Sequence, residues 1–461
     1  MGLTIVQKSD LSVVKPWAQK ALVLSGGAVT GGSFMTGGLK AINEYLENFT
    51  VCDFDIFVGI SAGSLIAAPL CAGLTPEEML RSLDGNSKHF FQFAPWHCYW
   101  PNFGELVTRP WEFAKAAAGY FPGALHELFG TWRQQGPRLA TAFWQLIWRP
   151  SAEHYTTFWN ILTAVLSTRS APSWLQLLPT GFFDNAPIER YLRRNIERNH
   201  LTNNFQVVER VRKKRLYICA MALDTAERVV FGPDERRDVT ISEAVQASTA
   251  LPVVYRPARI HGVDYVDGGV FETAHIDVAV AKGAQLIVCY NPFRPIENRV
   301  VWNYVSGQRE GGSTRPLSVH GIMAVLNQVF RAVFHTRLQQ TLTHYRRDDA
   351  FTGDIIVIEP HASDMAYFEL NPLLFGHRIK AAQMGFESVR NSIEAHYDAT
   401  AAIFRSYGIQ LTQTRVAEDF KRLRVPAQDP WEAQKVLEGR DTAPPFDPPR
   451  PRRKRAKARA S

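Results

Sequence analysis

The sequence predicts an α/β protein whose helices pack on a central, mostly parallel β-sheet. Two observations support this fold class. Short apolar runs at 21–27 and 55–60 have the composition of buried strands, and each leads within a few residues into a helical pattern. The same alternation returns after about residue 182. Strands that alternate with helices over short connections usually pair in parallel, with helices on the faces of the sheet.

The first part of this pattern is compact. Its expected elements are, in order, a strand at 21–27, a helix at 33–47, a strand at 55–60, a helix after Ser61 and a helix at 75–83. The third helix has a clear start, with Thr75 as N-cap, Pro76 at the first position and Glu78 completing a capping box.

Residues 90–181 differ from the rest, and we expect a mostly helical insertion there because strand-like runs are lacking. Eight of the eleven tryptophans lie in this stretch, at Trp96, Trp100, Trp111, Trp132, Trp144, Trp148, Trp159 and Trp174. Aromatic side chains with one polar and one apolar end suit a lipid–water boundary. They suit an ordinary aromatic core as well, so both interpretations stay open.

The α/β pattern then resumes. Its expected elements are a helix at 187–196, strands at 216–223 and 228–232, a helix at 240–249 capped by Thr240 and Glu243, a hairpin over 253–269 that turns at His261 and Gly262, a strand at 285–291, a long helix over 318–346, a strand at 354–360 and helices to about 406.

The positive charge of the chain belongs mainly to its end. The net charge is +8, and seven basic residues in "RPRRKRAKARAS" (450–461) leave +1 for the rest. Proline, charged and polar residues dominate from about 425, which predicts a disordered basic tail over 425–461. Such a tail is either a solvated end or an electrostatic attachment to anionic lipid or nucleic acid. We expect lipid rather than nucleic acid as the partner.

These observations divide the chain into five regions. They are an N-terminal extension (1–19), an α/β domain in two parts (20–89 and 182–424), the insertion (90–181) and the tail (425–461). The five cysteines are scattered and form no zinc-binding spacing, which favours a reducing compartment. We find no signal-peptide pattern and no apolar run long enough to span a membrane. We therefore expect a cytoplasmic protein, with peripheral membrane association as an option, and the oligomeric state stays open.

The stretch "DIFVGISAGSLIAA" (55–68) contains the first candidate for catalysis. Gly59, Ser61 and Gly63 form a G-x-S-x-G corner between an expected strand and an expected helix. Such a corner holds its serine in a strained turn with the hydroxyl exposed above the end of the sheet. The same five letters also occur by chance in long chains, but here the strand and helix context fits a nucleophile.

Two further segments have residue types that a serine nucleophile needs. The loop "SGGAVTGG" (25–32) lets the backbone at Gly26 and Gly27 approach a tetrahedral intermediate and aim N–H groups at its oxygen. Its spacing does not match a nucleotide-binding loop. Asp267 ends a β-rich run in "VDYVDGGVF" (263–271), where a dry carboxylate could accept the serine proton. Asp-Gly-Gly is also a common turn.

Taken together, the three segments resemble the patatin-like phospholipase family. The runs "EAVQASTALPVVYRPARIHGVDYVDGG" and "AVAKGAQLIVCYNPF" support the resemblance, which covers about 20–83 and 182–292. It implies a three-layer fold and hydrolysis of lipid acyl esters by a Ser–Asp dyad, without a metal or organic cofactor. By this resemblance Ser61 is the nucleophile, Asp267 is the base, and the backbone of Gly26, Gly27 and Ala28 forms the oxyanion hole. The supporting motif glycines are Gly31, Gly59, Gly63, Gly268 and Gly269.

The chain departs from the family pattern at three places. Ala28 replaces the third glycine of the loop and adopts positive φ less freely. Thr30 stands at the position of a basic residue that usually steadies the loop or attracts anionic substrate. Hydrolysis of an acyl ester is therefore a firmer expectation than activity on charged phospholipid. The proline that often follows D-G-G is missing from "ETAHID".

Two rival hypotheses remain open. One is a Ser–Asp–His α/β-hydrolase, for which the available histidines after the acid are His275, His320, His335, His344 and His361. The other is a lipid-binding protein that keeps the fold but has lost activity through its altered glycine loop.

Overall fold

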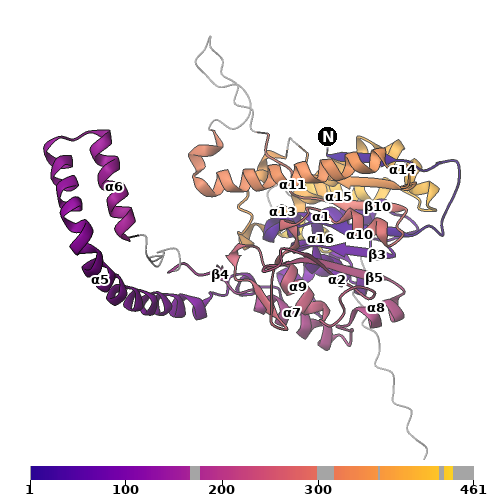
Figure 1. Ribbon diagram of the computed structural model, residues 1–461. Helices are drawn as coiled ribbons and strands as arrows, with labels where there is room; N and C mark the ends of the chain where they lie inside the picture. Colours follow the sequence, from indigo (N-terminus) through magenta and orange to yellow (C-terminus); the bar gives the residue numbers. More distant parts are fainter. Residues whose placement is uncertain (1, 167–176, 298–315, 362–363, 425–429, 440–461) are drawn as a thin grey trace, which may run out of the picture. The chain divides into compact units, whose positions relative to one another are not determined.

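The computed structural model describes residues 2–166, 177–297, 316–361, 364–424 and 430–439 (Figure 1). The chain forms two compact units. The main unit contains residues 1–100 and 184–461, and the helical unit contains residues 101–183.

A mostly parallel sheet is the centre of the main unit, as predicted. Its strand order is β1-β11-β10-β2-β3-β5-β9-β8, and β6 also pairs with β5. The four central pairings, β11/β10, β10/β2, β2/β3 and β3/β5, are parallel, whereas β1, β6, β8 and β9 join antiparallel. The strands are β1 (Leu3–Gln7), β2 (Lys20–Leu24), β3 (Ile56–Gly59), β5 (Arg215–Ala222), β6 (Arg228–Phe231), β8 (Ala258–Ile260), β9 (Val263–Asp267), β10 (Leu286–Tyr290) and β11 (Asp354–Ile358), and a further strand is β7 (Val253–Tyr255).

The predicted helices of the main unit are present in the expected order, and further helices accompany them. The helices are α1 (Ala28–Tyr45), α2 (Ala62–Ala72), α3 (Pro76–Asp84), α4 (Pro95–Cys98), α7 (Ala186–Arg198), α8 (Phe205–Arg212), α9 (Ile241–Ser248), α10 (Ile276–Ala281), α11 (Ile322–Arg347), α12 (Met365–Phe368), α13 (Arg378–Glu394), α14 (Tyr397–Ser406), α15 (Thr414–Arg424) and α16 (Pro430–Leu437). Some of them, such as α8 and α10, were not predicted. Single 3-10 turns lie at Gly268–Val270, Leu317–His320 and Phe375–His377.

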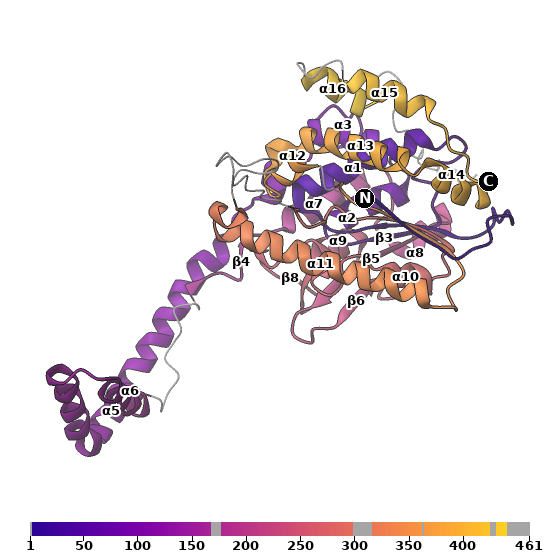
Figure 2. The same ribbon diagram turned by 90° about the horizontal axis from the view of Figure 1, so that it is seen from above.

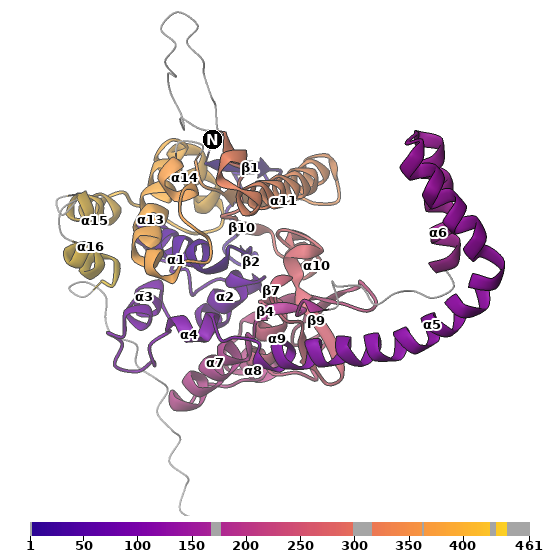
Figure 3. The ribbon, with the colours of Figure 1, turned by 90° about the vertical axis from the view of Figure 1, so that its left-hand side faces the viewer.

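The helices form one layer on each face of the sheet (Figures 2 and 3). Alternate residues of β2 show why: Leu22 and Leu24 pack into one core cluster with α1, α2 and α13, whereas Ala21 and Val23 pack into the other with α10 and α11. Side chains of a strand alternate between faces, and a central parallel strand is apolar on both.

Of the two capping boxes predicted in the main unit, one forms and the other does not. The capping box of α9 forms as expected, with Thr240 and Glu243 bonding each other's backbone. At α3, Thr75 accepts from the Glu78 N–H, but the Glu78 carboxylate bonds Arg81 and Ser87 instead of completing a box.

Both ends of the main unit contain more structure than predicted. Residues 3–7 of the expected extension form β1, which pairs antiparallel with β11 along its whole length. The expectation of disorder from residue 425 is wrong for Pro430–Leu437, which form α16 with Val436 and Leu437 buried. Arg81 fixes the end of this helix by donating to the carbonyls of Glu438 and Gly439 at 2.8 and 2.9 Å. The basic run at 450–461 lies outside the described residues.

The helical unit consists of α5 (Phe103–Trp148), α6 (Ala152–Leu166) and the short strand β4 (Gly181–Phe183). It begins at Pro101 rather than near residue 90, because Phe93 and Cys98 pack in a core cluster of the main unit. Four tryptophans of this unit, Trp111, Trp144, Trp148 and Trp159, are at least half exposed. The structure does not describe the side chain of Trp132, and Trp174 lies outside the described residues. None of the described helices combines the length and the apolar character that crossing a membrane would require.

Candidate active site

Ser61 lies at the corner between β3 and α2, as the sequence predicts. Its backbone has φ 53° and ψ −128°, a region that side-chain-bearing residues rarely occupy. A Cβ added to Gly59 would lie 2.6 Å from the Cα of Ser64, and one added to Gly63 would overlap the Leu24 carbonyl. Both glycines are therefore needed for the sharp turn that presents the Ser61 hydroxyl.

Ser248, at the end of α9, holds the strained corner in place. Its hydroxyl accepts from the Ser61 N–H at 2.9 Å and donates to the Cys219 carbonyl at 2.7 Å. Sequence reasoning missed this residue, because a serine in a helix within the run "EAVQAST" gives no sign of a partner 187 residues away.

The glycine loop between β2 and α1 lies directly against the nucleophile. A Cβ on Gly26 would be 3.1 Å from the Ser61 Cβ and 3.6 Å from its Oγ. Among the described residues, no acceptor faces the N–H groups of Gly26, Gly27 or Ala28, whereas the next two N–H groups donate to the Pro372 carbonyl at 3.1 Å. N–H groups without a partner beside a nucleophile are available to bind an oxyanion.

Ala28 occupies the position where the sequence departs from the family. It adopts φ 51°, the left-handed region that favours glycine. The alanine therefore keeps the loop geometry at an energetic cost. Gly31 closes the loop by donating its N–H to the Gly27 carbonyl at 2.9 Å. Thr30 is buried and uncharged, so this position of the loop carries no cation.

Asp267 ends β9 and is only 2% exposed. Its Oδ1 accepts from the Gly269 N–H at 2.8 Å, and the Ser61 side chain lies close enough to the carboxylate to favour its charged form. Burial raises the pKa of Asp267 to about 6, although the Gly269 N–H and the nearby Ser61 hydroxyl both act to lower it. Gly268 is required because a Cβ there would overlap the Cys219 carbonyl of β5. The fold thus brings Ser61, Asp267 and the glycine loop together from three distant segments.

An apolar cavity of about 170 Å³ opens from Ser61 into the main unit. It runs past Leu65 of α2 toward Met79 of α3, Ile196 of α7 and Val208 of α8. None of the described side chains that line it is charged. Its chemistry suits a hydrocarbon chain attached to the group that reacts at Ser61.

The histidines proposed for a triad lie away from this cavity, since no histidine is among its described lining residues. His275 is the nearest in sequence to Asp267 and is fully buried. Its Nδ1 lies 3.3 Å from the Arg228 guanidinium, which also pairs with Asp277. Burial lowers the pKa of His275 to about 4, so the ring is neutral at physiological pH.

The group around His275 also contains residue types that bind metals. Ligand atoms of Glu272, His275 and Asp277 lie within 4.8 Å of one another. The Arg228 guanidinium already supplies a positive charge to this group through its ion pair with Asp277. We therefore interpret the cluster as a support for the segment after Asp267.

Comparison with protein families now places the chain. A family model described as patatin-like phospholipase matches residues 22–280, more than half of the sequence. The protein belongs to the patatin-like phospholipase family. The match contains the glycine loop, the Ser61 corner and the Asp267 turn of this patatin-like protein, and it also includes residues 101–183.

Individual relatives of this patatin-like protein are distant. The chain is 21% identical over 270 residues to "Probable lipid hydrolase 463L" of Invertebrate iridescent virus 6. This matched region is 58% of this chain and 65% of the viral protein, so the chain spans less than two thirds of that relative. Among solved structures, VipD from Legionella pneumophila is 15% identical, with a TM-score of 0.33 and coverage of 86% of this chain and 70% of VipD. ExoU of Pseudomonas aeruginosa, solved in complex with SpcU, is 14% identical, with a TM-score of 0.25 and coverage of 95% and 72%.

Proposed function

We propose that this protein is a lipid acyl hydrolase that uses Ser61 as nucleophile and Asp267 as base. The observation that carries the proposal is the placement of Ser61. The residue stands on a strained corner near a buried carboxylate and free backbone N–H groups, and it lines an uncharged apolar cavity. The family membership and the name of the viral relative support the same class of activity.

In the proposed reaction the Ser61 Oγ attacks the ester carbonyl carbon while its proton passes to Asp267. The negative charge on the carbonyl oxygen is stabilised by the N–H groups of Gly26, Gly27 and Ala28. The tetrahedral intermediate then breaks its bond to the alcohol, which leaves with the proton from Asp267. A water molecule gives a proton to Asp267 and attacks the acyl-enzyme, and Ser61 regains that proton as the fatty acid departs.

The substrate class follows from the cavity and the loop. An uncharged, apolar cavity binds an acyl chain, and the buried Thr30 offers no charge for a phosphate. We therefore propose long-chain acyl esters as substrates, with the alcohol part directed away from the cavity. The exposed tryptophans of the helical unit and the basic tail fit a protein that works at a lipid surface in the cytoplasm.

The deciding experiment is labelling with a serine-directed fluorophosphonate together with turnover of a short soluble ester. Wild type should label and turn over, whereas Ser61→Ala should do neither. A folded wild-type protein that shows neither reaction would identify a lipid-binding protein without activity. His275→Gln and His335→Gln should retain turnover, since neither ring reaches the cavity. If one of them is as inactive as Ser61→Ala while Asp267→Asn stays active, the base is a histidine.

A further inference from the structure

Helix α11 carries an apolar face that is open to solvent. Its residues recur at helical spacing and are all between 41% and 73% exposed: Val319 on the preceding turn, then Ile322, Val325, Leu326, Val329, Phe330 and Val333. We name these seven residues the α11 stripe. The sequence from 316 to 330 contains no aspartate, glutamate, lysine or arginine. Soluble proteins rarely leave a contiguous apolar face of this kind without a use for it.

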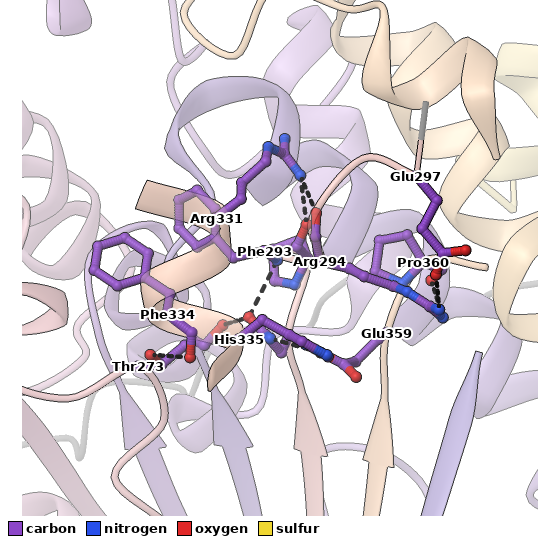
Figure 4. A network of polar contacts seen from close by, with 12 residues as sticks. Thr273, Phe293, Arg294, Glu297, Arg331, Phe334, His335, Glu359 and Pro360 are labelled. Carbon is purple, nitrogen blue, oxygen red and sulfur yellow. Dashed lines mark hydrogen bonds and ion pairs between the residues drawn. The ribbon is translucent and has the colours of Figure 1, made fainter. Parts of the chain in front are cut away.

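The opposite face fixes α11 in this orientation (Figure 4). Arg331 is buried, and its guanidinium donates to the carbonyls of Pro292 and Arg294 at 3.3 and 3.0 Å. The Gln328 side chain pairs with both backbone groups of Ile296 at 3.0 and 2.8 Å. Rotating the helix to bury the stripe would break these bonds, so the exposure belongs to the folded state.

The same contacts tie α11 to the loops that form the candidate active site. Thr273, shortly after Asp267, donates to the Phe334 carbonyl at 2.8 Å, and Arg337 donates to the Val270 carbonyl at 2.7 Å. The loop held by Arg331 follows the end of β10. Because β10, β2 and β3 are parallel and in register, this end lies at the same edge of the sheet as Ser61. Figures 1 and 2 show the first turns of α11 extending beyond the sheet.

A line of aromatic rings connects the stripe to the nucleophile. The exposed Phe330 stacks on Phe334 with ring centroids 6.1 Å apart, and Phe334 contacts Phe293 at 5.4 Å. The edge of Phe293 would be 3.1 Å from a Cβ on Gly26, which itself adjoins Ser61. This line of rings therefore joins the exposed stripe to the glycine loop beside Ser61.

We propose that the α11 stripe docks on the surface of a lipid bilayer and so brings the edge of the sheet that carries Ser61 to the lipid. The inference rests on the proposed function, because the line of rings joins the stripe to the loop beside a serine that is proposed to act on lipid esters. The stripe exposes valine, leucine, isoleucine and one phenylalanine, and it lacks the tyrosine, tryptophan and arginine that dominate protein interfaces. An uncharged stripe binds by burial of apolar area, so its attachment needs no anionic lipid and resists salt.

The test uses the full chain and vesicles of zwitterionic phosphatidylcholine. In the double variant Val325→Glu/Val329→Glu, two charges enter the middle of the stripe at exposed helical positions. The control is Val211→Glu, which adds one such charge at a 68% exposed valine on α8. Co-flotation is measured at 0.15 and 0.5 M salt, and turnover is measured on vesicle lipid and on a short soluble ester.

Wild type and Val211→Glu should bind the vesicles at both salt concentrations. The double variant should bind at least about tenfold more weakly, since two half-exposed valines no longer enter the apolar layer. Its turnover of the soluble ester should stay within about twofold of wild type, which also shows that the fold is intact. Equal binding by the double variant, binding that requires anionic lipid, or a wild-type dimer that the two charges dissociate would each overturn the proposal.

Vesicle binding does not depend on catalysis, so the two proposals can fail separately. A Ser61→Ala protein should bind vesicles as wild type does. If wild type fails to turn over any ester yet binds through the stripe, the proposed reaction is wrong and the docking surface stands.

Discussion

The burial of Asp267 leads to a prediction in which stability and turnover change in opposite directions. The pKa of this carboxyl is about 6 in the fold, against an ordinary value of 3.8, with burial as the main cause. One pKa unit corresponds to about 1.4 kcal/mol, so keeping Asp267 ionised in the folded protein costs about 3 kcal/mol above pH 6. In Asp267→Asn, Oδ1 can still accept from Gly269 and no charge is buried. The variant should therefore be up to about 3 kcal/mol more stable than wild type at pH 8.

The stability difference between Asp267→Asn and wild type should depend on pH. Below about pH 3.8 both states of the wild type hold the proton, and Asp267 costs nothing. Between pH 3.8 and about 6 only the unfolded chain releases it, so wild-type stability falls as the pH rises through this window. Asp267→Asn does not lose stability in this window, because asparagine does not titrate. Its advantage should be near zero at pH 4 and complete above pH 6.

Urea unfolding of both proteins at pH 4, 6 and 8 measures the difference in the free energy of unfolding. The reasoning is refuted if Asp267→Asn is no more stable than wild type at pH 8, or if the difference is the same at pH 4 and pH 8. In the proposed mechanism the same variant should lose at least ~10²-fold in soluble-ester turnover, as loss of a general base typically causes. Ser61→Ala should be as damaging, because the two residues act as one unit.

Three further predictions follow from the site and the tail. Ala28→Gly should raise the free energy of unfolding by up to about 1 kcal/mol in urea titrations, because glycine relieves the strain at φ 51°; unchanged or lower stability would mean that Ala28 is not strained. Ser248→Ala should lower the free energy of unfolding by about 1–3 kcal/mol and also reduce soluble-ester turnover, since it leaves the Ser61 N–H and the Cys219 carbonyl unpaired; full turnover would show that the corner holds itself. Truncation after residue 447 should weaken binding to anionic vesicles at low salt and leave soluble-ester turnover intact; equal vesicle binding with and without the tail would exclude the tail from lipid attachment.

The parallel core could be predicted from sequence because each central strand is apolar on both faces and leads into a helix within a few residues. The strand β1 could not be predicted, since "LTIVQ" is a short run near the chain start whose partner, β11, lies about 350 residues away. The helix α16 was hidden for a related reason. It is short and lies in a region rich in proline and charge, and its position depends on Arg81 of α3, which donates to the carbonyls that follow it.

Some residues of the candidate site could be predicted from the sequence and others could not. Ser61, Asp267 and the glycine loop stand out because their motifs require glycine at positions with no room for a side chain. Ser248 does not stand out, since its role depends on two backbone groups from other elements. The α11 stripe was also missed. An apolar pattern on a helix predicts burial, and only the contacts of Arg331 and Gln328 show that this face points outward.

Burial of Asp267 also shows how a carboxylate can act as the base in the proposed reaction without a histidine. A general base works best when its pKa lies near the working pH, and an exposed aspartate with a pKa near 4 is too weak. At about 6, Asp267 titrates close to where imidazole does, at about 6.5. Further N–H donors to the carboxylate would lower its pKa again, and at this site Gly269 supplies one backbone N–H. Exclusion of water from the Asp267 carboxylate, where β9 joins β5, therefore makes it more basic. We expect kcat/KM to fall on the acidic side with an apparent pKa near 6. An apparent pKa near 4 in the kcat/KM profile would show that water reaches Asp267 in the working protein.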